Sequence, residues 1–448
     1  MFTDFITNMI NSLSELLYSH ILIILLLGAG IFFTIKTKFV QIRMFIESLR
    51  VVAQPGSDKN GLSSFQALMV STASRVGTGN IAGISTAICL GGSGAVFWMW
   101  LTAILGSASA FIESTLAQIY KHKAKDGSSY GGPAYYIQAA LKKRWIGVLF
   151  AVVLILTYMG GFNLVASFNI ADSFRVYSFF NPEWTPLIVG AILAVVFALA
   201  VFGGSKKISQ ITEVLVPVMG IFYLAVSLFI ILKHYQLVPV MFTSIFNNAF
   251  DVQAIFGGFA GSCVMHGIKR GLFSNEAGMG STPHAHAVAK VQYPAQQGLM
   301  GIVSVFIDTF VVLNMTALVI FVTGALDGTT TGIALTQKAF STGLGAFGIK
   351  FVAICLLFFA FSTIVGWYFF GEQNVKYLFG TRGVTPYRVV VMCFIVMGSL
   401  LQVNLVWELA DMFNGLMAFP NLIALIGLAK VVSKALDEFE QANLADNK

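Results

Sequence analysis

Two long apolar stretches of this chain are interrupted by glycine residues, and they lie in matching halves of the sequence. The first, from Phe65 to Leu90, is interrupted at residues 76–80, which read Val-Gly-Thr-Gly-Asn. The second, from Ile255 to Ala285, contains Gly257, Gly258, Gly261 and Gly267. An interrupted membrane helix leaves backbone N–H and C=O groups unpaired, which is tolerated only where they are buried in protein or line a cavity. The matched pair therefore predicts the binding site of a secondary transporter.

Composition places the whole chain in the membrane. Hydrophobic residues make up 57% of the sequence and charged residues only 10%, whereas a typical soluble domain is about 25% charged. At about 20 residues for each crossing, the chain is long enough for about eleven helices. We expect these helices near residues 17–35, 64–90, 95–118, 146–170, 186–203, 213–232, 254–282, 298–323, 349–371, 387–405 and 411–433. The predicted fold class is an all-α polytopic membrane protein.

The distribution of positive charge predicts the topology. Most of the 27 lysines and arginines fall in the segments 36–59, 121–144, 206–207, 269–290, 376–388 and 430–448. Because cytoplasmic loops are enriched in these residues, we expect a multi-pass protein of the cell inner (plasma) membrane with its N-terminus outside and its C-terminus in the cytoplasm. This topology accounts for the net charge of +7, so the charge implies the lipid bilayer and no nucleic acid as a partner.

The helix count suggests an internal repeat. The helix at 17–35 stands apart, and the other ten divide into five over residues 64–232 and five over residues 254–433, each group beginning with an interrupted helix. Five is an odd number, so the two groups cross the membrane in opposite directions. Inverted repeats of this kind are typical of alternating-access carriers. The polar residues 434–448 form a short cytoplasmic tail, and the chain is one transporter domain.

The interruption at Gly77-Thr-Gly-Asn80 has the chemistry of an anion site. If the helix unwinds here, the backbone amides of Thr78, Gly79 and Asn80 begin a new half-helix whose positive dipole end favours a carboxylate. The alternative interpretation is a glycine-mediated contact between two helices. The matched interruption in the second half favours the binding site.

Ser362 and Thr363 are adjacent hydroxyl residues in an otherwise apolar run. Hydroxyl oxygens are hard ligands that suit a cation such as sodium, particularly beside the unwound backbone carbonyls of Ala73 and Val76. The alternative is that each hydroxyl donates to the carbonyl one turn back in its own helix.

Further polar and aromatic side chains lie within the predicted helices. Asn163 and Ser167 are four residues apart and share a helix face, where they contact substrate or bridge two helices. Trp367 follows Gly366 and either closes a pocket or belongs to an interfacial aromatic belt.

Ionisable residues inside a membrane are functional by default. Arg75 precedes the first interruption, and Glu276 follows the second. We expect Arg75 to pair with Glu276 or Asp308 as a possible intracellular gate or as a static structural pair. A proton-coupled carrier, with Asp308 and Glu113 as the titrating groups, is an alternative.

Other functional classes lack the residues that they need. An ion channel requires a continuous polar lining or a ring of charges, and no segment supplies one. An enzyme requires a nucleophile with a base and an orienting partner, and Ser274 with His284 lacks the third group, so we expect no enzymatic activity. His284 and His286 are too isolated for a metal site and are expected at the surface of a cytoplasmic loop.

At these positions the chain resembles the alanine/glycine:cation symporter family, a branch of the amino acid–polyamine–cation carriers. The matching blocks cover nearly the whole chain. They are residues 75–83 (Arg-Val-Gly-Thr-Gly-Asn-Ile-Ala-Gly), 91–100, 131–135, 269–283 (Lys-Arg-Gly-Leu-Phe-Ser-Asn-Glu-Ala-Gly-Met-Gly-Ser-Thr-Pro) and 361–367.

The resemblance implies a LeuT-type 5+5 inverted repeat and sodium-driven uptake of a small neutral amino acid, with Na⁺ as the coupling ion and no organic cofactor. It implies that the amides of Thr78 and Gly79 hold the substrate carboxylate and that Trp367 closes the pocket. The predicted substrate contacts are Thr78, Gly79, Asn80, Asn163, Ala166, Ser167, Gly261 and Trp367. The predicted sodium ligands are Ala73, Val76, Ser362 and Thr363.

One segment departs from the family pattern. Members of the family usually carry a glutamine that faces substrate where this chain has Ala166, and an asparagine where it has Phe168. Losing a buried amide removes a hydrogen bond partner worth about 1–3 kcal/mol, and alanine enlarges the pocket. Alanine or glycine remains the first prediction for the substrate, with a bulkier amino acid such as glutamine as the alternative.

Overall fold

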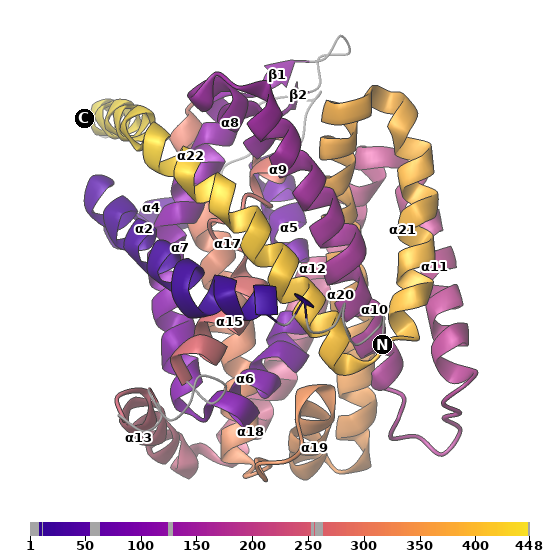
Figure 1. The fold of residues 1–448 in the computed structure, drawn as a ribbon. Coiled ribbons are helices and arrows are strands. Elements are labelled where there is room, and N and C mark those ends of the chain that lie inside the picture. Colours follow the sequence, from indigo (N-terminus) through magenta and orange to yellow (C-terminus); the bar gives the residue numbers. More distant parts are fainter. Residues whose placement is uncertain are drawn as a thin grey trace.

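The computed structural model describes residues 9–446, apart from residues 11, 54–62, 124–128, 252–254 and 256–262. Over these residues the chain is a bundle of helices (Figure 1). The strands within the described part are β1 (His122–Lys123) and β2 (Ser129–Tyr130), which pair antiparallel with His122 opposite Tyr130. The all-helical prediction is therefore confirmed.

Six helical runs within the described residues are long and apolar enough to cross a membrane. They are Gly94–Ile119, Arg144–Asp172, Gly204–Lys233, Pro294–Val322, Ala346–Ser399 and Leu405–Ala445. Leu22–Lys36, Gly79–Gly91 and Thr185–Val201 are shorter apolar helices. The predicted helix 349–371 and most of the predicted helix 387–405 fall inside the single run Ala346–Ser399, and the count of eleven remains a prediction.

The elements up to Ala249 include the six helices predicted there and five segments outside them, at residues 40–43, 45–53, 133–141, 235–237 and 238–249. The elements are η1 (Leu17–Ile21), α2 (Leu22–Lys36), α3 (Val40–Arg43), α4 (Phe45–Ala53), α5 (Ser64–Arg75), η2 (Gly79–Gly83), α6 (Ile84–Gly91), α7 (Gly94–Ile119), α8 (Pro133–Leu141), α9 (Arg144–Thr157), η3 (Tyr158–Phe162), α10 (Asn163–Asp172), α11 (Thr185–Val201), α12 (Gly204–Lys233), η4 (Tyr235–Leu237) and α13 (Val238–Ala249). Leucine, isoleucine and valine side chains on the outer faces of α11 and α12 are exposed, as expected where lipid replaces water.

The remaining elements are α15 (Cys263–Asn275), α16 (Pro283–Val288), α17 (Pro294–Phe306), η6 (Ile307–Leu313), α18 (Asn314–Val322), α19 (Gly332–Leu344), α20 (Ala346–Phe379), η7 (Gly380–Gly383), α21 (Val384–Ser399) and α22 (Val403–Asp446). The π-helical turns η2, η3 and η6 interrupt apolar helices inside the bundle. Such turns are rare and are frequent at functional sites.

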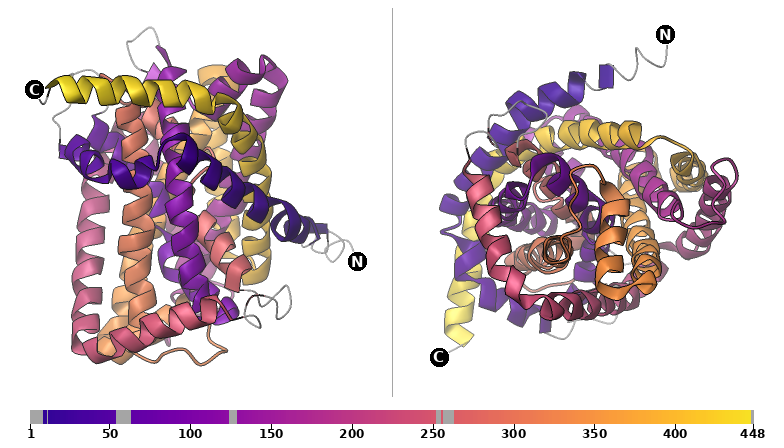
Figure 2. Two further views of the ribbon diagram at one scale, coloured as in Figure 1. Left: turned by 90° about the vertical axis from the view of Figure 1, so that its left-hand side faces the viewer. Right: turned by 90° about the horizontal axis from the view of Figure 1, so that it is seen from below.

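Helix α7 packs against α17, α15 and α2. The two ends of the bundle differ. The far half of α22 bends and runs across the end that carries β1, β2 and α8, whereas α13 and α19 lie across the opposite end (Figures 1 and 2). Both interrupted segments therefore lie between two capped ends of the molecule.

Candidate functional site

The first predicted interruption is present in the structure. Helix α5 ends at Arg75, and Val76 adopts an extended conformation with φ −76° and ψ 90°. The N–H of Gly77 donates to Oδ1 of Asn80 at 2.8 Å, rather than to the carbonyl of Ala73 as it would in a continuous helix. Every residue from 76 to 83 is buried. The unwound segment is thus enclosed by protein, which is the condition for tolerating it in a membrane.

The structure brings part of the predicted sodium site together. The hydroxyl Oγ1 of Thr363 on α20 lies 3.3 Å from the carbonyl oxygen of Val76. Thr363 also donates to the carbonyl of Phe359 at 2.7 Å, and Ser362 donates to that same carbonyl at 2.8 Å. The bonding within the helix named above as the alternative is therefore formed as well. The hydroxyl oxygen of Ser362 lies 3.7 Å from the sulfur of Met219 on α12. Of the two hydroxyls, that of Thr363 is therefore the one in contact with the first interruption.

Within the described residues, the second apolar stretch is interrupted after Gly267 rather than at it. Gly257, Gly258 and Gly261 lie outside the described residues, and α15 continues through Gly267 without a break. A β-carbon at Gly267 would lie 2.6 Å from the carbonyl oxygen of Ala95, so this glycine lets α15 pack closely on α7. The helix ends at Asn275 instead.

A turn over residues 276–282 forms the second interruption. Its backbone is left-handed at Glu276 (φ 52°), Gly278 (φ 82°) and Gly280 (φ 86°). The carboxylate of Glu113 on α7 accepts the N–H groups of Gly278 at 3.3 Å and Gly280 at 3.0 Å. The amide of Asn421 on α22 donates to the same carboxylate at 3.1 Å. Glu113 therefore holds the second interruption in shape.

The predicted gate residues lie close to the interruptions without forming an ion pair. The Arg75 guanidinium donates to Ser71 Oγ at 3.3 Å and to Thr282 Oγ1 at 3.1 Å. Among the described residues, no carboxylate oxygen lies within 4.0 Å of Arg75. The Glu276 carboxylate instead accepts the indole N–H of Trp367 and the hydroxyl of Ser74. Arg75 thus joins α5 to the second interruption through Thr282.

An aromatic cluster surrounds Trp367. The Trp367 ring stacks on Tyr158 with centroids 5.9 Å apart and meets Phe162 edge-on at 4.9 Å. Phe273 on α15 contacts Trp367 and, on its other side, Trp407 of α22. Trp367 is therefore fully buried in the bundle and not part of an interfacial belt.

The predicted residues of α10 divide into two groups. Ser167 donates to the carbonyl of Asn163 at 2.8 Å, and a β-carbon at Gly398 of α21 would lie 2.3 Å from the Ser167 hydroxyl. Ser167 therefore lies against α21 and away from the interruption. Ala166 is buried in the core. Asn163 is buried, and neither the oxygen nor the nitrogen of its side-chain amide has a hydrogen bond partner. The hydroxyl of Thr78 is also buried and unpaired. These two residues therefore have polar groups available for a ligand.

A model of the sodium:alanine symporter family matches residues 3–448. The chain belongs to this family. It is 44% identical over 437 residues to the probable sodium/glutamine symporter GlnT of Bacillus subtilis (strain 168), covering 96% of this chain and 90% of that protein. It is 40% identical over 441 residues to the amino-acid carrier protein AlsT of the same organism (97% and 92% covered). It is 38% identical over 454 residues to the sodium/alanine symporter AgcS of Methanococcus maripaludis (98% of each chain covered).

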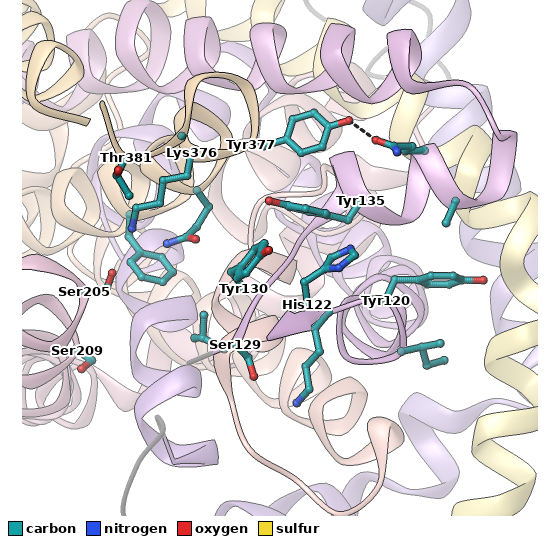
Figure 3. Close-up of a pocket in the computed structure, with 18 of the residues that line it drawn as sticks. Tyr120, His122, Ser129, Tyr130, Tyr135, Ser205, Ser209, Lys376, Tyr377 and Thr381 are labelled. Carbon is teal, nitrogen blue, oxygen red and sulfur yellow. Dashed lines mark hydrogen bonds between the residues drawn. The ribbon is translucent and has the colours of Figure 1, made fainter. Parts of the chain in front are cut away.

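This member of the sodium:alanine symporter family has a large cavity at the end of the bundle near β1 and β2. Its volume is about 1700 Å³, and Figure 3 shows Tyr130, Tyr135 and His122 on one side with Lys376 and Thr381 on another. None of the residues predicted to bind substrate or sodium lines it. The cavity approaches the aromatic cluster through Phe369 and Gln373, which lie on α20 shortly after Trp367.

The cavity is electropositive. Its described lining includes five cationic side chains and no aspartate or glutamate: Lys121, Lys142, Arg144, Lys206 and Lys376. Burial, assisted by the charges of Lys123 and Lys290, lowers the pKa of Lys121 to about 8. All five cationic residues lie in segments that the charge distribution predicts to be cytoplasmic.

Two features escaped the sequence interpretation. Lys269 and Arg270 are not in a cytoplasmic loop but are buried in α15, where Asp411 of α22 accepts two hydrogen bonds from Arg270 at 2.8 and 3.2 Å. Lys269 lies 3.5 Å from the same carboxylate. The sequence alone could have indicated this burial. Two adjacent cations inside an apolar run require a buried counter-charge, and Asp411, the first residue of the last predicted helix, is an acidic residue that could supply it.

The two histidines of α16 are also buried, contrary to the surface location expected for them. His284 shares hydrogen bonds with the Ser281 carbonyl at 2.7 Å and with the Asn374 amide at 2.8 Å, and His286 with Gln297 at 2.8 Å. Burial lowers the pKa of each histidine to about 4. They join α16 to α20 and α17, respectively, as neutral imidazoles.

Proposed function

We propose that this protein is a secondary active symporter that imports a small neutral amino acid, alanine or glycine first, together with sodium by alternating access. Its family and its named relatives support sodium-coupled amino acid transport. The observation that carries the proposal is the contact between the Val76 carbonyl and the Thr363 hydroxyl at 3.3 Å, because it joins a buried, unwound backbone to a hydroxyl on a facing helix. Those oxygen atoms suit sodium.

The proposed substrate site lies at the first interruption. The amides of Thr78 and Gly79 receive the carboxylate at the beginning of η2, where the helix dipole is favourable. The unpaired hydroxyl of Thr78 and the unpaired amide of Asn163 supply further hydrogen bonds. Trp367 closes the pocket. Asn80, Ala166 and Gly261 complete the proposed contacts, and Gly261 lies outside the described residues.

The proposed sodium site uses the carbonyls of Ala73 and Val76 with the hydroxyls of Ser362 and Thr363. Ala73 contributes because the N–H of Gly77 bonds elsewhere. A hydroxyl that donates to a helix carbonyl keeps lone pairs for a cation, so the bonds to Phe359 do not exclude the site. Ser362 requires a small rotation away from Met219 to take part.

We assign the transport cycle to two five-helix repeats of a LeuT-type fold that move relative to one another. Sodium joins α5 to α20 and favours the form that is ready for substrate, because a ligand shifts a population toward the state that it binds better. We propose that the electropositive cavity is the aqueous path to the cytoplasm and that the C-terminus lies on that side of the membrane. Arg75, Glu276 and Asp308 lie where a gate between path and site would open.

Glutamine is a second candidate substrate. The relative with 44% identity is named a probable sodium/glutamine symporter. In addition, Ala166 replaces a glutamine side chain at a buried position of α10, which leaves more volume for a longer substrate.

The test is uptake of labelled alanine into proteoliposomes under an inward sodium gradient, with a potassium control and with glycine and glutamine as competitors. Sodium-dependent uptake that glycine blocks supports the proposal, and uptake blocked only by glutamine selects the second candidate. Uptake that depends on a proton gradient and not on sodium refutes the proposed sodium coupling.

A variant pair examines the sodium site. Ser362→Ala combined with Thr363→Ala should raise the sodium concentration needed for uptake at least tenfold, which corresponds to about 1.4 kcal/mol. Ser341→Ala combined with Thr342→Ala is the matched control. That pair is also an adjacent Ser-Thr, bonds to the Lys338 carbonyl of its own helix, and lies in α19 away from the interruption. Equal sodium dependence in the two double variants contradicts the assignment.

A further inference from the structure

Four aromatic rings form one wall of the electropositive cavity. The His122 ring stacks on Tyr130 with centroids 5.7 Å apart and lies 5.0 Å from the Tyr135 ring. The Tyr135 ring in turn meets Tyr377 edge-on at 4.9 Å. The four residues come from β1, β2, α8 and α20, and all of them line the cavity (Figure 3). Because none of them is buried, part of each ring is open to the cavity, and we call the four rings the aromatic wall.

Four of the five cationic side chains in this cavity have no acidic partner. No carboxylate oxygen of the described residues lies within 4.0 Å of them: Lys121, Lys142, Arg144 and Lys206. The fifth, Lys376, pairs with Glu372 at 2.6 Å. Lys121 donates instead to neutral oxygens, the side-chain carbonyl of Gln118 at 2.6 Å and the backbone carbonyl of Ala289 at 3.0 Å. The cavity therefore carries a positive charge that the described residues do not balance.

The effect of this unbalanced charge is clearest at Lys121. Burial and the charges of Lys123 and Lys290 lower its pKa to about 8, so its surroundings disfavour the charged form. By contrast, the buried Arg270 has the Asp411 carboxylate at 2.8 Å. A cleft lined by charges of one sign raises the local concentration of oppositely charged ligands. The unpaired cations therefore favour an anion in the cavity.

The chemistry of the lining fits a nucleotide. Lysine and arginine bind phosphate oxygens through charge-assisted hydrogen bonds, and the hydroxyl residues Ser205 and Thr381 lie on the same side of the cavity as Lys376 (Figure 3). A nucleobase stacks on aromatic side chains, whereas a free phosphate or a carboxylate would leave the aromatic wall uncovered. The cavity volume of about 1700 Å³ exceeds the roughly 300–1,000 Å³ of a typical small-molecule pocket, so a nucleotide has room.

We propose that a nucleotide binds in this cavity, with its base on the aromatic wall and its phosphates at the unpaired cations. The site spans the two predicted repeats, because Lys121, Arg144 and Lys206 lie in the first and Tyr377 lies in the second. A bound nucleotide therefore links two groups of helices that move relative to one another in the proposed cycle, and it occupies the proposed path to the cytoplasm. Nucleotide binding inhibits uptake for both reasons. The inhibition rests on the proposed function, whereas the binding site does not.

The test is equilibrium binding of radiolabelled ATP, as its Tris salt, to the purified full-length protein in detergent. The wild-type protein should bind ATP saturably. Inorganic phosphate and adenosine should each bind at least about tenfold more weakly, because each lacks one of the two parts that the cavity recognises. Raising the ionic strength should weaken ATP binding, because salt screens the attraction of the cations. A wild-type protein that binds no ATP overturns this inference and leaves the proposed function intact.

Two matched lysine pairs distinguish the cavity from the general surface charge. Lys142→Gln combined with Lys206→Gln removes two exposed cations of the lining and should weaken ATP binding at least about tenfold. Lys143→Gln combined with Lys207→Gln changes the next residue in each segment, outside the lining, and should leave the affinity unchanged. Thermal unfolding shows that both variants remain folded. Equal weakening in the two pairs overturns the site, because it means that ATP is attracted by net charge alone.

Tyr130→Ala examines the aromatic wall. It should weaken ATP binding about tenfold and leave the binding of inorganic phosphate unchanged, because stacking is lost and the cations remain. Tyr235→Ala is the control, since Tyr235 is an exposed tyrosine of η4, directly before α13, and this variant should bind ATP as the wild type does. Inorganic phosphate that binds as tightly as ATP, with no effect of Tyr130→Ala, overturns the nucleotide assignment.

Proteoliposomes with Tris-ATP on both sides of the membrane test the inhibition. Sodium-driven alanine uptake should fall by more than about half once ATP exceeds its dissociation constant, because the nucleotide favours the state that it binds. The Lys142 and Lys206 double variant should need at least about tenfold more ATP for the same inhibition. ATP binding with no effect on uptake overturns the inhibition. A protein that binds ATP but takes up no alanine in its absence overturns the proposed function and leaves the nucleotide site intact.

Discussion

Gly77→Ala examines the contact on which the proposed sodium site depends. The β-carbon of an alanine at this position would lie 2.1 Å from Oγ1 and 3.0 Å from Cβ of Thr363. Favourable contacts between such atoms occur at about 3.5–4.0 Å, so the unwound segment and α20 must separate by more than about 1 Å. Thr363 cannot turn away easily, because its hydroxyl is bonded to the Phe359 carbonyl at 2.7 Å.

The expected cost has two parts. Overpacking a buried contact usually destabilises a protein by about 1–3 kcal/mol, so the midpoint of unfolding should fall. A binding site must be held within about 0.5 Å of its productive geometry, and the displacement exceeds that. The sodium concentration for half-maximal uptake should therefore rise more than tenfold, which corresponds to about 1.4 kcal/mol or more of lost binding free energy.

The assay compares sodium-dependent alanine uptake and unfolding of Gly77→Ala with those of Gly220→Ala. A β-carbon at Gly220 of α12 meets no atom within 4 Å, and alanine is favoured over glycine in a helix by up to about 1 kcal/mol. The control should be as stable as the wild type or more stable, with unchanged uptake. Adding Thr363→Ala to Gly77→Ala removes the clashing hydroxyl and should restore stability but not sodium affinity.

Equal stability and sodium affinity in the Gly77 and Gly220 variants would refute the reasoning. That result would mean that the first interruption and α20 separate freely and that their contact does not form the ion site.

Two further expectations follow from buried charges. Asp411→Asn leaves Arg270 buried without its carboxylate and should destabilise the protein by about 3–5 kcal/mol in reversible unfolding, whereas Asp437→Asn, which breaks an exposed pair with Lys38, should cost less than about 1 kcal/mol; similar losses in both variants would contradict the assignment. His284 and His286 each have a pKa lowered to about 4 by burial, so the unfolded chain binds more protons than the folded one between about pH 6.5 and 4. Their contribution to the free energy of unfolding should be fully present above about pH 6.5. It should fall as the pH drops toward 4, by up to about 1.4 kcal/mol per pH unit for each histidine. Melting temperatures that stay constant across this range would contradict the expectation.

Much of the architecture could be predicted without tertiary contacts. Hydropathy identified the apolar helices, because a membrane requires long apolar segments whose backbone groups bond within the segment. The motif Gly77-Thr-Gly-Asn80 marked the first interruption to within two residues of Arg75, where α5 ends. Both signals are local, so the sequence carries them directly.

Features that depend on residues far apart in the sequence were predicted less accurately. Glycine was taken as the mark of the second interruption, yet Gly267 remains helical because its role is to admit the backbone of α7 at Ala95. The actual break at Glu276 is held open by Glu113, which lies 163 residues earlier in the chain by subtraction of the two residue numbers. A contact of that separation leaves no local pattern.

The sequence by itself therefore determined that this protein is an all-helical membrane protein of the sodium:alanine symporter family with an unwound segment at Gly77. The tertiary structure decided which polar groups are paired. It buried Lys269 and Arg270 against Asp411, turned His284 and His286 inward, and brought Asp308 to the amide of Asn80 and the hydroxyl of Ser274. The physical reason is that the cost of burying a charge depends on the partners that distant elements bring to it, and no local stretch of sequence contains those partners.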